Sequence, residues 1–277
     1  MIAYIIWDIG PIIFEGFEYL RWYGLCWAIG MILGYQFMLR IYKAENIPAI
    51  ELDKLATYVV LGAIVGARLG HILFYDPIYY WNNPVEILPI RIKPTFEFTG
   101  LAGLASHGGI GGALIALYFY NRKFKKNYLW LLDRLTIAGA AVGGFIRLGN
   151  LLNSEMIGTP SNLPWAFVFI SVDQIPRHPS QLYEALFYFL LSISLFFIWR
   201  SGKFHDNNGF IFGLGIGLIF TQRFLVEFLK ENQVPFEENL TLNMGQTLSI
   251  PLVLVGVVMI VWSLKSPPTN NRLNEQV

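Results

Sequence analysis

Three arginines interrupt stretches of the sequence that are otherwise strongly apolar. Arg68 lies in GARLGHILFY, Arg147 in GGFIRLGNLLNSEMIG and Arg223 in RFLVEFLK. A guanidinium group stays charged and presents a planar fork of donors that fits the oxygens of a phosphate. A charged side chain near the centre of a bilayer costs on the order of 3 kcal/mol and usually marks a functional interior site. The three arginines therefore indicate chemistry on an anionic, phosphate-bearing ligand.

The composition indicates that the surrounding elements are membrane spans. The chain has 277 residues, of which 55% are hydrophobic and 14% are charged. These values are typical of a polytopic membrane protein. The formal net charge is +1, and no basic block alternates with aromatic residues, so a nucleic-acid partner is not expected. The single cysteine, Cys26, lies among apolar residues and is expected to be a small buried hydrophobe.

Seven stretches are long and apolar enough to cross about 30 Å of hydrocarbon, which requires roughly 20 helical residues. The predicted fold class is therefore an all-α polytopic membrane protein with seven transmembrane helices. The expected spans are Leu20–Tyr42, Leu52–Tyr75, Leu101–Tyr120, Tyr128–Asn150, Gln181–Arg200, Gly209–Leu229 and Met244–Leu264.

The segments between these spans predict a single membrane domain over residues 1–264 with two additions. Residues 76–100 combine prolines with tyrosines and tryptophan, which favours an interfacial arm on the membrane surface. Residues 159–180 are too polar to span and form a small extracytoplasmic head segment, in which AFVFISV predicts a short strand. Residues 265–277 are expected to be a disordered cytoplasmic tail.

The basic residues of the loops predict the orientation. The loops after the first, third, fifth and seventh spans carry most of them, including the cluster NRKFKK at 121–126. Basic residues accumulate on the cytoplasmic side, so the C-terminus is expected to be cytoplasmic and the N-terminus outside.

This orientation brings the polar residues of the spans to one side of the membrane. The three arginines would lie at a similar depth in the outer half, because spans two, four and six all run outward. The expected result is a net-cationic pocket open to the outer leaflet, made by Tyr23, Arg68, His107, Arg147, Asn150, Glu155, Arg223 and Glu227.

Simpler explanations exist for several of these residues. Each arginine alone could extend to the outer headgroups or form a structural ion pair with Glu155 or Glu227. His107 could be an ordinary interfacial histidine, and His71 is expected to be one. The spacing of the four histidines gives no support for a metal site. The small residues of the spans favour helix packing over a nucleotide loop, notably in the pairs Gly30–Gly34, Gly62–Gly66 and Gly108–Gly112.

Seven motifs, in order along the chain, together resemble the bacterial prolipoprotein diacylglyceryl transferases. GGFIRLGNLLNSEMIG at 143–158 is similar to the signature of that family. The other motifs are LRWYGL, GARLGHILFY, ASHGGIGG, RHPSQLYEA, RFLVEFLK and NMGQ.

The resemblance implies a multi-pass enzyme of the bacterial cytoplasmic (inner) membrane. Such enzymes transfer the diacylglyceryl group of phosphatidylglycerol to the lipobox cysteine of a prolipoprotein, forming a thioether and releasing glycerol phosphate. They need no cofactor and no metal; their partners are phosphatidylglycerol, other membrane lipids and the prolipoprotein signal peptide. The family's functional residues match Tyr23, His107, Arg147, Asn150, Glu155, Gly158, Arg223 and Glu227.

These residue types suit the implied reaction. Arg147 and Arg223 would stabilise the negative charge that grows on the departing phosphate, and His107 is the candidate general base. Tyr23, Asn150 and Glu155 would orient the headgroup and the arginines. Arg68 could contact the lipid phosphate or hold the arm. His178 and Gln181 are weaker candidates for contact with the protein substrate.

Two other classes of protein remain alternatives. An anion transporter would also need arginines in its spans, but polar residues should then line a route to the cytoplasmic side. A non-catalytic lipid-binding scaffold would not need the combination of His107, Asn150 and Glu155.

Overall fold

The computed structural model describes residues 4–14, 20–88, 90–91, 96–98, 103–231 and 241–267. The chain forms two compact units. The first unit comprises Met1–Ile41 together with Leu129–Val277, and the second comprises Tyr42–Tyr128.

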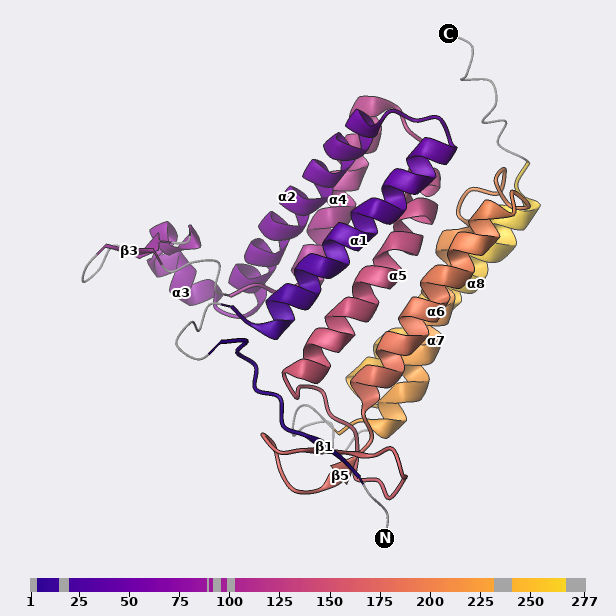
Figure 1. Cartoon of the computed structure of the whole chain (residues 1–277). Coiled ribbons are helices and arrows are strands. Elements are labelled where there is room, and N and C mark those ends of the chain that lie inside the picture. Colours follow the sequence, from indigo (N-terminus) through magenta and orange to yellow (C-terminus); the bar gives the residue numbers. More distant parts are fainter. Residues whose placement is uncertain are drawn as a thin grey trace. The chain divides into compact units, whose positions relative to one another are not determined.

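The first unit is built from long apolar helices (Figure 1). They are α1 (Trp22–Ala44), α5 (Tyr128–Leu152), α6 (Ser180–Arg200), α7 (Phe210–Val226), which continues into the 3-10 turn η2 (Glu227–Leu229), and α8 (Met244–Lys265). Their ends follow local chemistry. Gly209 precedes α7 with φ of +91°, a conformation that favours glycine, and the side chain of Asn243 caps α8.

Glycines let the helices of this unit approach closely. A Cβ on Gly30 or Gly34 of α1 would meet Phe145 Cβ at 3.0 Å and Val142 Cγ2 at 2.9 Å, both on α5. The predicted packing role of Gly30 and Gly34 is therefore confirmed. Cys26 is buried, as expected for a small apolar side chain.

A small sheet lies beyond the end of α5 and before the start of α6 (Figure 1). Its strands are β1 (Ile5–Trp7), β4 (Phe167–Phe169) and β5 (Pro176–Arg177), in the order β1–β4–β5. β1 pairs with β4 in parallel, and β4 pairs with β5 in antiparallel fashion. The strand predicted within AFVFISV is confirmed. Phe167 and Phe169 pack against Leu151, which anchors the sheet on α5.

The second unit contains α2 (Ala49–Phe74) and α4 (Ser106–Phe124), which lie side by side (Figure 1). A Cβ on Gly66 would lie 2.6 Å from Gly112 Cα, and one on Gly70 would lie 2.7 Å from Gly108 Cα. The backbones of the two helices are thus in direct contact, and the predicted packing role of these glycines is confirmed.

The segment predicted as an arm follows α2 and is built from short elements. These are α3 (Pro77–Asn82), the 3-10 helix η1 (Pro84–Ile87), β2 (Ile90–Arg91) and β3 (Glu97–Phe98), and the two strands pair in antiparallel fashion. Pro77 and Pro84 each start a helical turn, where the missing N–H costs nothing. Ile78 and Trp81 are strongly exposed, and the location of this segment on the membrane surface stays a prediction.

The predicted fold class, an all-α polytopic membrane protein, is confirmed. Within the described ranges, six helices are long and apolar enough to cross a membrane: α1, α2, α5, α6, the continuous α7–η2 helix and α8. The stretch expected as the third span is also helical, as α4, but it is not among those six. The count of seven spans therefore remains a prediction.

Candidate active site

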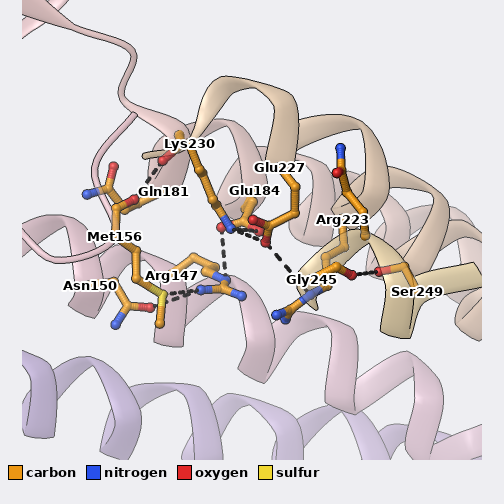
Figure 2. Close-up of polar contacts among 12 residues, drawn as sticks. Arg147, Asn150, Met156, Gln181, Glu184, Arg223, Glu227, Lys230, Gly245 and Ser249 are labelled. Carbon is orange, nitrogen blue, oxygen red and sulfur yellow. Dashed lines mark hydrogen bonds and ion pairs between the residues drawn. The ribbon is translucent and has the colours of Figure 1, made fainter. Parts of the chain in front are cut away.

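Five side chains of the first unit form a continuous series of alternating charges, here called the charge chain (Figure 2). Arg147 Nε lies 3.1 Å from Glu184 Oε2, and Lys230 Nζ lies 3.0 Å from Glu184 Oε1. Lys230 Nζ also lies 3.2 Å from Glu227 Oε1, and the same oxygen lies 3.9 Å from Arg223 Nε. Glu184 and Glu227 thus each bridge two cations.

Burial differs along the charge chain. The side chain of Glu184 is fully buried and that of Lys230 is 3% exposed, whereas Arg147 is 12% and Arg223 is 37% exposed. Buried ions are tolerated only when each is paired, because desolvation costs several kcal/mol per ion. Three cations and two carboxylates leave the charge chain with an excess of one positive charge. Arg223, the most exposed and most loosely paired cation, is the member best placed to bind an external anion.

Aromatic side chains of α6 pack against glycines of α5, one helical turn before Arg147, which pairs with Glu184. A Cβ on Gly143 would meet Tyr188 Cδ2 at 3.2 Å, and one on Gly144 would meet Phe189 Cε1 at 2.6 Å. The two glycines of the GGFIR motif therefore make room for aromatic rings of α6. Figure 2 shows Arg147 and Glu184 reaching toward each other from the two helices.

Asn150 connects the charge chain to Glu155. Its Oδ1 accepts a hydrogen bond from Arg147 Nη1 at 3.4 Å, and its Nδ2 donates to Glu155 Oε2 at 3.1 Å. Asn153 Nδ2 donates to the other oxygen, Glu155 Oε1, at 3.1 Å. The carboxylate of Glu155 is exposed but held in a fixed orientation.

A cleft of about 610 Å³ opens beside Glu155. It is lined by Leu20, Arg21, Tyr23, Gly24, Leu25, Asn153 and Glu155. Tyr23 lies against α5, because a Cβ on Gly149 would approach Tyr23 Cδ2 to 2.9 Å. The cleft therefore brings together Tyr23 and Glu155, two predicted site residues that lie far apart in the sequence.

The turn that carries Glu155 is strained. Its neighbours Ser154 and Met156 have φ of +53° and +55°, a region that non-glycine residues rarely occupy and that costs on the order of 1 kcal/mol or more for each. The start of α6 holds the turn in place. Ser180 Oγ donates to the Met156 carbonyl at 2.7 Å, and Gln181 Nε2 donates to the Glu155 carbonyl at 2.5 Å. Gln181 is fully buried, so it supports the turn instead of offering a surface to a substrate.

Gly158 lies at a crowded crossing of backbones. A Cβ there would lie 2.5 Å from the His178 carbonyl oxygen and 2.7 Å from that of Leu229, so only glycine fits. The Gly158 carbonyl accepts a hydrogen bond from Arg177 Nη1 at 3.3 Å. Gly158 is thus a structural residue that joins the head segment to the end of α7.

Arg177 fastens the head segment through two carboxylates. It forms an ion pair with Asp173 at 2.5 Å and another with Glu231. The hydrogen bond from Arg177 lowers the pKa of the Asp173 carboxyl below its ordinary value. The same bond raises the pKa of Arg177, which stays charged. This clasp links β5 to the residues that follow η2, one of which is Lys230 of the charge chain.

Two expected site residues, His107 and Arg68, belong to the second unit. His107 is exposed near the start of α4, and its ring packs 5.2 Å from that of Phe74. Arg68 donates to the carbonyls of Glu86 at 2.5 Å and Ile87 at 3.0 Å, and it also lies over the ring of Tyr80. Of the two roles considered for Arg68, these contacts match the one in which it holds the arm.

Sequence reasoning did not select Glu184 or Lys230, which lie at the centre of the charge chain. A signal for Glu184 was present. It is the only acidic residue within Ser180–Arg200, and Arg147 in a neighbouring span requires a counter-ion. Lys230 had no comparable signal, because a lysine just past a span is usually an ordinary loop charge. The alternative that Arg147 pairs with Glu155 is not what the structure shows, since its carboxylate partner is Glu184.

Comparison with known proteins identifies the family of this chain. The family model described as prolipoprotein diacylglyceryl transferase matches residues 11–262. A protein of Bacteroides fragilis named phosphatidylglycerol--prolipoprotein diacylglyceryl transferase is 48% identical over 91% of this chain and 92% of its own length. Proteins with the same name from Tolumonas auensis and Chloroherpeton thalassium are 44% and 41% identical, covering 94% and 95% of this chain and 98% and 96% of their own lengths. The chain therefore belongs to the prolipoprotein diacylglyceryl transferase family.

Proposed function

We propose that this protein transfers the diacylglyceryl group of phosphatidylglycerol to the lipobox cysteine of prolipoproteins, the first step of bacterial lipoprotein maturation. Relatives that align with this chain over nearly their whole length are named for this activity. The observation that carries the proposal within this chain is the charge chain, which has an excess of positive charge and ends at the partly exposed Arg223.

The reaction places its main electrostatic demand on the leaving group. The cysteine sulfur attacks the glyceryl carbon, the bond from that carbon to the phosphate oxygen breaks, and the electron pair departs with glycerol phosphate. Negative charge therefore grows on the phosphate oxygen in the transition state. Arg147 and Arg223 would stabilise that charge, and removing one preorganised donor of this kind typically costs about 3 to 4 kcal/mol in the barrier.

The remaining site residues would orient these groups. Asn150 fixes Arg147 and Glu155 relative to each other through its two side-chain hydrogen bonds. Tyr23 and Glu155 line the cleft that would receive the lipid headgroup. Glu227 holds Arg223, and Gly158 allows the crossing that positions Lys230.

The nucleophile is supplied by the substrate, so the buried Cys26 has no role in the chemistry. Deprotonating a thiol of pKa about 8.5 costs only about 2 kcal/mol at pH 7. A general base is thus a secondary requirement, and His107 is our candidate because its imidazole is exposed near the start of α4 and can accept a proton. A His107→Gln variant with an undiminished rate from about pH 6 to about pH 9 would exclude this assignment.

We further propose that the protein lies in the bacterial cytoplasmic membrane with its N-terminus outside and its C-terminus inside. The distribution of basic loop residues supports this orientation. In this arrangement both compact units belong to one membrane domain with seven spans, and the site opens to the outer leaflet. Labelling of single cysteines in Cys26→Ser protein with a membrane-impermeant maleimide would test it. Protection of a cysteine at Asp173 in intact cells would contradict the proposed sidedness.

The activity can be tested with purified protein, phosphatidylglycerol vesicles and a synthetic lipobox peptide. We expect the mass of the peptide to increase by one diacylglyceryl group, and we expect the gain to vanish when the peptide cysteine is replaced by serine. Phosphatidylcholine vesicles serve as the lipid control. No mass gain with phosphatidylglycerol would refute the proposed function.

A further inference from the structure

We propose that Asn243 is a positioning residue, which orients the Glu227 carboxylate and through it the cations Arg223 and Lys230. The inference rests on the proposed function, which it extends from the residues of the charge chain to the start of α8. Within the charge chain Asn243 contacts Glu227, so its effect on transfer would pass through that carboxylate.

The two halves of the Asn243 side chain have different partners. Its side-chain Oδ1 accepts a hydrogen bond from the backbone N–H of Gln246 at 2.8 Å and so caps α8. In return, the backbone N–H of Asn243 donates to Gln246 Oε1 at 3.1 Å. Its Nδ2 donates to Glu227 Oε2 at 3.2 Å. Asparagine can therefore cap the helix and hold the carboxylate at the same time, whereas serine or aspartate could supply only the cap.

This contact divides the two oxygens of Glu227 between different neighbours. Oε2 is held by Asn243, while Oε1 faces Lys230 Nζ at 3.2 Å and Arg223 Nε at 3.9 Å. Fixing one oxygen prevents rotation of the carboxylate, so the other stays directed at both cations. Lys230 in turn pairs with Glu184 of α6, and Glu184 pairs with Arg147.

The backbone of α8 supports the same orientation. A Cβ on Gly245 would lie 2.7 Å from Glu227 Cδ and 2.8 Å from its Oε1. The absence of a side chain at Gly245 therefore lets the carboxylate rest on the first turn of α8 (Figure 2). That turn is favourable for a negative charge, because the N-terminal end of a helix carries a partial positive charge.

Substitutions at Asn243 can separate the cap from the contact with Glu227. Asn243→Ser keeps a capping oxygen and loses the amide donor, so we expect a smaller loss of stability than in Asn243→Ala and a transfer rate at least about tenfold lower than that of the wild type. The loss should appear in kcat more than in KM, because the perturbed cations act on the leaving group. Asn243→Ala should lower both stability and rate.

Asn243→Asp gives a signature that a merely structural role would not produce. The introduced carboxylate can still cap α8, but it would repel Glu227 instead of donating a hydrogen bond to it. The facing charged groups, Arg223, Lys230 and Glu184, are the same in both proteins. Asn243→Asp should therefore keep a cap as good as that of Asn243→Ser and yet transfer more slowly than Asn243→Ser, whereas a merely structural role predicts similar rates for the two variants.

A substitution at Gly245 tests the same orientation of Glu227 from the backbone of α8. Gly245→Ala should lower transfer by displacing Glu227 although alanine favours a helix, and Gly139→Ala is the matched control because a Cβ there meets no atom within 4 Å. If wild-type protein is active and Asn243→Ser and Gly245→Ala retain its rate, the positioning role is wrong and the proposed function stands. If wild-type protein transfers no diacylglyceryl group, both are wrong.

Discussion

Neutralising Glu184 should destabilise the protein strongly, because it would leave the buried Lys230 and the largely buried Arg147 without their shared partner. Glu184 Oε2 lies 3.1 Å from Arg147 Nε, and Oε1 lies 3.0 Å from Lys230 Nζ. At an effective dielectric constant of about 20, each contact amounts to roughly 5 kcal/mol of Coulomb energy before desolvation is subtracted. Breaking such a buried pair by removing one partner costs about 3 to 5 kcal/mol net.

The change to make is Glu184→Gln, which preserves the size of the side chain and removes its charge. The unfolding midpoint of the purified protein in lipid nanodiscs should fall by an amount corresponding to about 3 to 5 kcal/mol. The double variant Glu184→Gln, Lys230→Met removes one positive charge as well, so it should recover much of the lost stability. Transfer should not recover, because Arg147 still lacks the carboxylate that orients it.

Two results would refute this reasoning. One is a loss of stability below about 1 kcal/mol in Glu184→Gln, the range measured for exposed ion pairs. The other is a double variant that is no more stable than Glu184→Gln. Either result would mean that Glu184 is solvated or that the ion pairs do not form in the membrane.

Three further predictions concern the supporting structure. Because the pKa of Asp173 is lowered, its ion pair with Arg177 contributes its full stability above the ordinary aspartate pKa of about 3.9, and this stability is lost as the pH falls through the lower folded pKa. Proteolysis of the head segment should therefore increase in that acidic range, and Asp173→Asn should show the increase already at neutral pH. Gly66→Ala should cost about 1 to 3 kcal/mol by forcing α2 and α4 apart, measured as a lower unfolding midpoint, while Gly111→Ala, where a Cβ meets nothing within 4 Å, should not. Asp133→Asn should also lower the midpoint, by about 1 to 3 kcal/mol, because the Asp133 carboxylate accepts hydrogen bonds from Gly209 N and Phe212 N, both at 2.8 Å; an unchanged midpoint would show that these bonds do not support the start of α7.

The helices were predictable because each is a long, predominantly apolar run, even where a single arginine interrupts it. The polar residues of the GGFIRLGNLLNSEMIG motif were also predictable as site residues, because an arginine within a membrane span costs free energy and usually marks a functional site. Arg147, Asn150 and Glu155 do lie together, and Tyr23 and Glu155 line one cleft.

The sequence did not predict which side chains pair with each other, because the pairing depends on which helix faces approach each other. Glu184 pairs with Arg147 where Gly143 and Gly144 of α5 admit aromatic rings of α6. The left-handed turn at Ser154 and Met156 contradicts local preference and persists because Ser180 and Gln181 hold it. Arg68 could have faced a ligand or the arm, and its contacts with the Glu86 and Ile87 carbonyls could be known only from coordinates.

The most direct test of the account is the single-turnover rate of diacylglyceryl transfer by Arg223→Ala at saturating phosphatidylglycerol. Arg223 is partly exposed and loosely paired, so its loss should leave the unfolding midpoint nearly unchanged. If Arg223 stabilises the departing phosphate, the rate of peptide mass gain should fall by about 100-fold or more. A rate within about threefold of wild type would contradict the claim that the exposed end of the charge chain carries the catalytic charge.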